Sequence, residues 1–140
     1  MTVITLLISV TLIQVPLGNV SGGNIAIVSE EGNPVDMVEN VSMKIVSPYW
    51  NIDYCNVSTT NVSVADFLFE CADHYGFSVK ADNWDSYDSL FVESIDYIEN
   101  GKDGKYWQYY VNDEFAHVGC SRFYLKDNDI VEWRFEKSPF

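Results

Sequence analysis

The segment that decides the fold runs from Gly104 to Phe135 and reads GKYWQYYVNDEFAHVGCSRFYLKDNDIVEWRF. Its first part, residues 106–111, is a dense run of residues that favour β-structure. Successive side chains of a strand point to opposite faces of a sheet, so this run has two distinct faces. One face carries Trp107, Tyr109 and Val111, and the other carries Tyr106, Gln108 and Tyr110.

Two polar turns divide the rest of this segment. Asn112 and Asp113 follow the first run, and both residue types tolerate the positive φ that a tight hairpin requires. The pattern predicts a returning strand at residues 115–118. A second polar turn at 126–129 precedes a last alternating strand at 130–135.

A helix is expected over residues 64–75. Ser63 is a favourable N-cap, apolar residues recur at helical spacing along one side, and Gly76 stands where a left-handed residue ends a helix. This apolar stripe needs a sheet to cover. We therefore assign Trp107 and Trp133 to the core beneath the helix, which leaves the other face of the first strand turned outward.

The remaining elements are weaker. Short strands are expected at residues 25–29, 35–46, 77–80 and 90–98, and loops at 48–60 and 81–89. Strands followed by one helix and then more strands predict an α+β class, β-grasp-like, with one helix packed across a mostly antiparallel sheet.

Several of these stretches resemble the transcobalamin-like C-terminal domain family, a β-grasp module of secreted and cell-surface proteins. The matching stretches are FVESID at 91–96, YWQYYVN at 106–112, Gly119, and LKDNDIVEW at 125–133. The resemblance extends over roughly residues 24 to 136. It departs from the family at both turns, where Asp113 and Asn128 stand in place of glycine.

The resemblance also implies a ligand face. In the transcobalamins the stretch matching residues 106–109 lies against the corrin ligand, so it implies ligand-binding residues at Tyr106, Trp107, Gln108, Tyr109 and Tyr110. Cobalamin is held there against a large helical domain that has no counterpart in these residues. This domain alone would form only half of such a site and would bury about half as much of the ligand. We therefore expect no cofactor, and the resemblance alone suggests cobalamin. The expected partner is a small molecule or a cell-surface protein.

Charge limits the classes of partner. The net charge is −13, and no charged residue precedes Glu30. Such a surface repels phosphate backbones and anionic lipid headgroups, so we expect no nucleic-acid partner.

The first residues predict a secretory leader. Residues 1–17 are apolar, and small residues follow at Gly18, Ser21 and Gly22. We expect a leader at 1–23 and a folded domain at 24–140, secreted or at the cell surface, with no stable membrane span once the leader is removed. A retained leader would favour an alternative, a self-assembling structural subunit of the cell envelope or of an extracellular filament.

Three Asn-Val-Ser sequons lie close together, at Asn40, Asn56 and Asn61. A sequon in a secreted protein accepts a glycan when it is exposed, so the sequence predicts glycosylation in this region.

Three cysteines, an odd number, leave at least one thiol without a partner inside the chain. Cys71 lies on the apolar side of the helix and Cys120 follows the hairpin. We expect these two to form a disulfide and Cys55 to stay unpaired.

The sequence gives no catalytic arrangement. His74 and His117 are the two histidines, and neither lies in a known catalytic motif. Asp82, Asp85 and Asp88 recur at every third position of a loop, but the spacing of a calcium loop is absent. We therefore expect a binding module that is not an enzyme and has no metal site.

Overall fold

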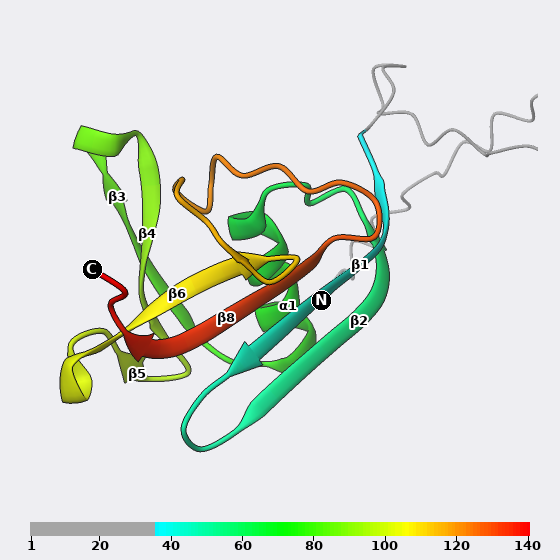
Figure 1. Ribbon diagram of the computed structural model, residues 1–140. Coiled ribbons are helices and arrows are strands. Elements are labelled where there is room, and N and C mark those ends of the chain that lie inside the picture. Colours follow the sequence, from blue (N-terminus) through cyan, green and yellow to red (C-terminus); the bar gives the residue numbers. More distant parts are fainter. Residues whose placement is uncertain (1–35) are drawn as a thin grey trace, which may run out of the picture. The chain divides into compact units, whose positions relative to one another are not determined.

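Eight strands in two sheets and one α-helix make up the part of the chain that this computed structural model describes, residues 36–140 (Figure 1). The larger sheet has the strand order β2-β1-β8-β6-β7, and the smaller has the order β3-β4-β5. Within the larger sheet β1 and β8 run parallel, and the other neighbours are antiparallel. The strands are β1 (Val38–Val46), β2 (Asn51–Thr59), β3 (Val79–Trp84), β4 (Ser89–Ile95), β5 (Ile98–Glu99), β6 (Lys105–Val111), β7 (Glu114–Phe115) and β8 (Ile130–Lys137).

The predicted class, an α+β fold that is β-grasp-like with one helix across a mostly antiparallel sheet, is wrong. The fold is mostly β, and its strands form two separate sheets rather than one. The expected loop at residues 48–60 contains β2. Its Ile52, Tyr54 and Val57 pack against the core, but an extra residue between Tyr54 and Val57 interrupts the alternation, with Asn56 at φ 57°. A bulged strand rich in Asn and Ser lacks the regular period that identifies strands in a sequence.

The helix α1 (Val64–Tyr75) confirms its prediction residue for residue. The Ser63 Oγ accepts a hydrogen bond from the Asp66 N–H at 3.0 Å, and Gly76 adopts φ 75°. The Gly76 N–H donates to the Ala72 carbonyl at 2.8 Å, which closes the last turn. The buried side of the helix consists of Val64, Ala65, Phe67, Leu68, Cys71 and Ala72.

The core lies between α1 and one face of the larger sheet. Trp107 is 5% exposed and Trp133 is 2% exposed, so both expected core positions are confirmed. The Trp107 ring stacks on Trp50 at 6.3 Å and lies 5.1 Å from the Phe135 ring. Its indole N–H donates to the Ile98 carbonyl at 2.8 Å, which ties the larger sheet to β5 of the smaller one.

The hairpin after β6 turns as predicted but returns only briefly. Asn112 and Asp113 have φ values of 51° and 65°. The returning strand β7 covers two residues, Glu114 and Phe115, rather than the expected 115–118. The chain then leaves the larger sheet toward β4, and this departure creates the site described below.

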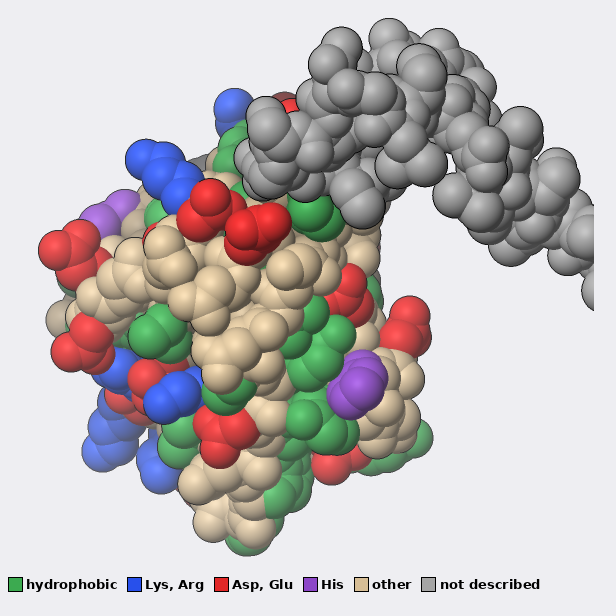
Figure 2. Space-filling model, turned by 90° about the vertical axis from the view of Figure 1, so that its right-hand side faces the viewer, with side chains coloured by type: hydrophobic (Ala, Val, Ile, Leu, Met, Phe, Trp, Pro, Cys, Tyr) green, Lys and Arg blue, Asp and Glu red, His purple; other side chains and the backbone are tan. Residues whose placement is uncertain are grey.

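The expected leader at residues 1–23 and the expected strand at 25–29 lie outside the described residues. Within residues 36–140, no helix combines the length and the apolar character needed to cross a bilayer. Figure 2 shows Asp and Glu spread over the face on the β2 side of the molecule, while Lys and Arg gather toward one margin.

Candidate functional site

The two faces of β6 separate as the alternation predicts. Trp107, Tyr109 and Val111 are buried, at 5%, 7% and 7% exposure, whereas Tyr106 is 43% exposed. Gln108 and Tyr110 are half-buried on the same side as Tyr106. The register with β8 is regular along the whole strand, so the buried face of β6 continues into the buried face of β8.

A cleft of about 180 Å³ opens beside the buried face of β6. Three parts of the chain that are distant in the sequence enclose it: β4, β6 and the segment that follows β7. Apart from a glutamine and a cysteine, its side chains are apolar or aromatic. The lining consists of Leu90, Phe91, Val92, Trp107, Gln108, Tyr109, Phe115, Ala116, Val118, Gly119, Cys120 and Trp133.

Hydrogen bonds hold the walls of the cleft in place. The Tyr109 hydroxyl donates to the Val118 carbonyl at 2.5 Å, which fixes the segment after β7 against β6. Burial raises the pKa of Tyr109, so this hydroxyl stays protonated and keeps donating at neutral pH. On the opposite wall the Leu90 N–H donates to the Ser121 Oγ at 3.0 Å.

Gly119 allows the segment after β7 to approach the start of β4 closely. A Cβ placed at this position would stand 1.6 Å from the Ser89 Oγ and 2.4 Å from the Ser89 Cβ. No side chain fits in that space, so glycine is required for close approach rather than for backbone conformation. This gives a physical reason for the glycine that the sequence pattern singled out.

The groups in the cleft suit binding better than covalent chemistry. Burial raises the pKa of the Cys120 thiol to about 11, so it is protonated and weakly nucleophilic at neutral pH. Its Sγ donates to the Leu90 carbonyl at 3.5 Å. His117 lies outside the lining, with its ring 5.0 Å from that of Phe115.

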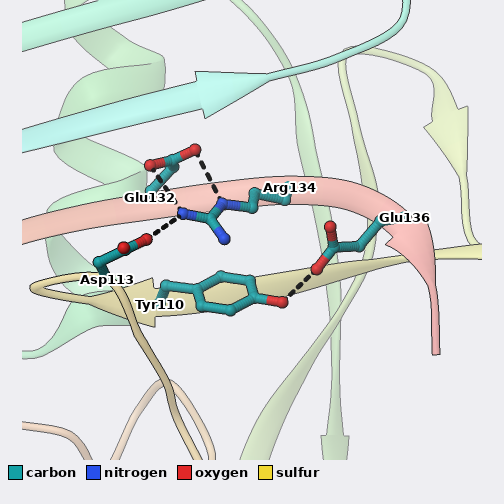
Figure 3. A network of polar contacts seen from close by, with 5 residues as sticks. All are labelled: Tyr110, Asp113, Glu132, Arg134 and Glu136. Atoms are coloured by element: carbon teal, nitrogen blue, oxygen red, sulfur yellow. Dashed lines mark hydrogen bonds and ion pairs between the residues drawn. The ribbon is translucent and has the colours of Figure 1, made fainter. Parts of the chain in front are cut away.

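The outward face of β6 carries a polar network instead of a cleft (Figure 3). The Arg134 guanidinium lies 3.8 Å from the centre of the Tyr110 ring and pairs with Glu132 at 2.8 Å and with Asp113 at 2.7 Å. The Tyr110 hydroxyl donates to Glu136. That hydrogen bond raises the pKa of Tyr110, and the hydrogen bond to Glu132 raises the pKa of Arg134. These groups satisfy one another, so they leave few polar atoms for a ligand.

The structure therefore separates the five predicted ligand residues. Trp107 and Tyr109 of the buried face line the cleft together with Gln108, which belongs to the outward side of β6, whereas Tyr106 and Tyr110 do not line it. Sequence reasoning missed the contributions of β4 and of the segment after β7. Gly119 was the one available signal for that segment, and residues 91–96, which include most of β4, matched the family pattern without indicating that they line a site.

The predicted disulfide is absent from the structure. Cys71 and Cys120 are buried free thiols, and Cys55 is an exposed one. The Cys120 carbonyl accepts a hydrogen bond from the Ala65 N–H at 2.9 Å, at the first turn of α1. Cys71 lies six residues further along the helix from Ala65, about 9 Å at the helical rise. The backbone of Cys120 is therefore anchored near the start of α1, whereas Cys71 lies in the second half of the helix.

The three predicted glycosylation sites differ in their contacts. The Asn40 Nδ2 donates to the Asn128 Oδ1 at 2.8 Å, and the Asn61 Nδ2 donates to the Glu70 Oε1 at 3.1 Å. Asn56 is exposed on the edge strand β2, and its side-chain amide makes no hydrogen bond within residues 36–140.

Within residues 36–140, no three His, Cys, Asp or Glu side chains gather as a metal ion would require.

Comparisons with known proteins identify the family and the fold. The family model for a domain of unknown function, DUF4430, matches residues 61–137. No curated protein matches the sequence. The crystal structure of haptocorrin in complex with Cbi is similar, with a TM-score of 0.57 and 16% identity over 75% of this chain and 26% of haptocorrin.

A second similar structure is a protein from Ruminococcus gnavus ATCC 29149 to which metal binding is ascribed. Its TM-score is 0.55 at 12% identity, over 71% of this chain and 98% of that protein. The present chain thus spans about a quarter of haptocorrin and nearly all of the bacterial protein. Identities this low show a shared transcobalamin-like fold and nothing beyond it.

Proposed function

The chain belongs to the DUF4430 family, and we propose that its folded domain is a non-catalytic module that binds a small molecule in the cleft between β4, β6 and the segment after β7. The observation that carries this proposal is the cleft itself. It is mainly apolar and aromatic, and hydrogen bonds at Tyr109 and Ser121 preform its walls. Small-molecule sites commonly have these properties.

The size of the cleft limits the ligand. At about 180 Å³ it is smaller than the roughly 300–1,000 Å³ of typical drug-sized sites. A corrin such as the Cbi bound by haptocorrin would insert an edge or a side chain and leave its ring outside. We therefore propose that this domain by itself binds small apolar molecules, and binds cobalamin weakly or together with a partner surface.

Secretion and glycosylation belong to the same proposal. The apolar stretch at residues 1–17 and the sequons support a module that works outside the cell or at its surface. Exposure of Asn56 on β2, away from the residues that line the cleft, would let a glycan be carried without blocking the ligand.

A fluorescent probe can test the site. The neutral dye N-phenyl-1-naphthylamine gains fluorescence in apolar surroundings, so titration measures its affinity for the protein. Val118 is 49% exposed and lines the cleft, so Val118→Trp should fill the opening with little strain and weaken binding by about tenfold or more. Tyr106→Ala, on the outward face of β6, is the matched control and should leave the affinity unchanged.

The reverse pattern would overturn the proposal. If Tyr106→Ala and Tyr110→Ala weaken dye binding while Val118→Trp does not, the ligand face is the outward side of β6. Absorbance titrations with cobalamin and Cbi on the same variants show whether a corrin uses the same surface.

A further inference from the structure

Three buried side-chain polar atoms within residues 36–140 lack a hydrogen-bond partner: Glu70 Oε2, Gln108 Oε1 and Trp133 Nε1. Buried polar atoms are nearly always paired, so each exception requires an explanation. Gln108 is anchored on the outward side of β6, where its Nε2 donates to the Glu136 and Lys137 carbonyls. Gln108 and Trp133 both line the cleft, but Gln108 is held by these two hydrogen bonds, whereas the Trp133 indole N–H makes none within residues 36–140.

The Trp133 indole N–H has no hydrogen-bond partner within residues 36–140. Its side chain is 2% exposed, and its ring lies 5.2 Å from the Tyr109 ring, which also lines the cleft. The strands on both sides of β8 hold it at a fixed register, opposite Ile45 of β1 and Tyr109 of β6. Trp107 provides the contrast, since its indole N–H reaches the Ile98 carbonyl at 2.8 Å. An aliphatic residue at position 133 would have filled the core without leaving an unpaired donor.

We propose that the Trp133 Nε1–H is the hydrogen-bond donor of the cleft, and that its ligand is a small uncharged apolar molecule carrying an acceptor oxygen, such as a ketone or an amide carbonyl. This inference rests on the proposed function. An aromatic ring with a carbonyl fits the lining, because the apolar walls cover the ring and the indole receives the oxygen. An anion does not fit, because no Lys or Arg lines the cleft and the chain carries a net charge of −13.

A matched pair of probes tests the donor. Acetophenone carries a carbonyl where α-methylstyrene carries a methylene group, and the two molecules have nearly the same shape. Protein labelled with ¹⁵N in its tryptophan indoles gives one N–H signal for each of Trp50, Trp84, Trp107 and Trp133. Acetophenone should shift the Trp133 signal downfield, whereas α-methylstyrene should bind without that shift. The Trp107 signal is the internal control, because its N–H is already bonded to Ile98.

The affinity ratio of the two probes gives a second measure. Trp133→Phe keeps an aromatic ring and removes the donor, so the preference for acetophenone over α-methylstyrene should fall by about three- to tenfold. The spectra of the unmodified protein need no variant, so a folding defect in Trp133→Phe would not prevent the test. If both probes bind and neither moves the Trp133 signal, the donor assignment is wrong, but the proposed binding in the cleft is still supported. If neither probe binds, the proposed site fails and the inference with it.

Discussion

Replacing Trp107 by alanine tests the packing that supports the cleft. The side chain is 5% exposed, stacks on Trp50 and packs against Phe135. Removing a buried tryptophan costs about 3–5 kcal/mol, because the surrounding core cannot close the cavity. The Ile98 carbonyl would also lose the indole N–H, at a further cost of roughly 1 kcal/mol. We therefore expect Trp107→Ala to lower the free energy of unfolding by about 4–6 kcal/mol.

This loss is large relative to the total stability of about 5–15 kcal/mol that is usual for a domain. Urea unfolding followed by far-UV circular dichroism at low temperature would measure it. Tyr106→Ala is the matched control, because the neighbouring side chain is 43% exposed on the opposite face of the same strand. It should change the free energy of unfolding by about 0.5 kcal/mol or less. If Tyr106→Ala destabilises the protein more than Trp107→Ala does, the assignment of the two faces of β6 is wrong.

Three further predictions follow from the same structure. Burial raises the pKa values of the two interior cysteines, to about 12 and about 11, so the folded state holds protons that the unfolded state releases near pH 9. The free energy of unfolding should therefore be insensitive to these thiols below about pH 8 and fall as the pH rises above 9. A thiol reagent at pH 8 should modify only Cys55 until the protein unfolds. Rapid labelling of all three cysteines would contradict this. Gly119→Ala forces the segment after β7 away from Ser89, so it should cost about 1–3 kcal/mol and weaken dye binding, whereas Gly104→Ala, whose Cβ would meet no atom within 4 Å, should leave the dye affinity unchanged. Secretion from a eukaryotic host should give a glycan chiefly at Asn56, as measured by intact mass before and after glycosidase treatment. Asn56→Gln should remove most of the added mass. A glycan confined to Asn40 or Asn61 would show that the side-chain hydrogen bonds of these two residues do not prevent glycosylation.

Local signals explain what could be predicted from the sequence. Helix α1 begins and ends at the predicted residues, because a side-chain cap at Ser63 and a left-handed glycine at Gly76 act within a few positions. The two faces of β6 follow from strict alternation of its side chains. Strand β2 was missed because a bulge near Asn56 shifts the apolar residues out of phase. Counting β2 as loop contributed to the class error, but the division of the strands into two sheets depends on long-range pairing that no local pattern shows.

The candidate site could not be predicted, because no single segment contains it. Trp107 and Tyr109 were correctly placed on one strand, but the opposite walls come from Leu90 and Val118, which pattern analysis does not bring near them. The expected disulfide failed for a related reason. Helix position predicted that Cys71 is buried, but it did not predict which end of the helix Cys120 would approach.

The cleft arises because β6 is paired to different extents along its two edges. Along one edge β6 pairs with β8 over its full length, but along the other it pairs with β7 only at Tyr110 and Val111. The backbone groups left over there bond to non-strand partners: the Trp107 N–H donates to the Asn100 Oδ1, and the Tyr109 carbonyl accepts from the Ala116 N–H. Because β4 belongs to the smaller sheet, it passes this edge without pairing to it. Two strands that are close but not hydrogen-bonded leave space between their side chains, and a longer β7 would close that space by extending the sheet. The short hairpin return, which the sequence pattern overestimated, is therefore the structural condition for the cleft.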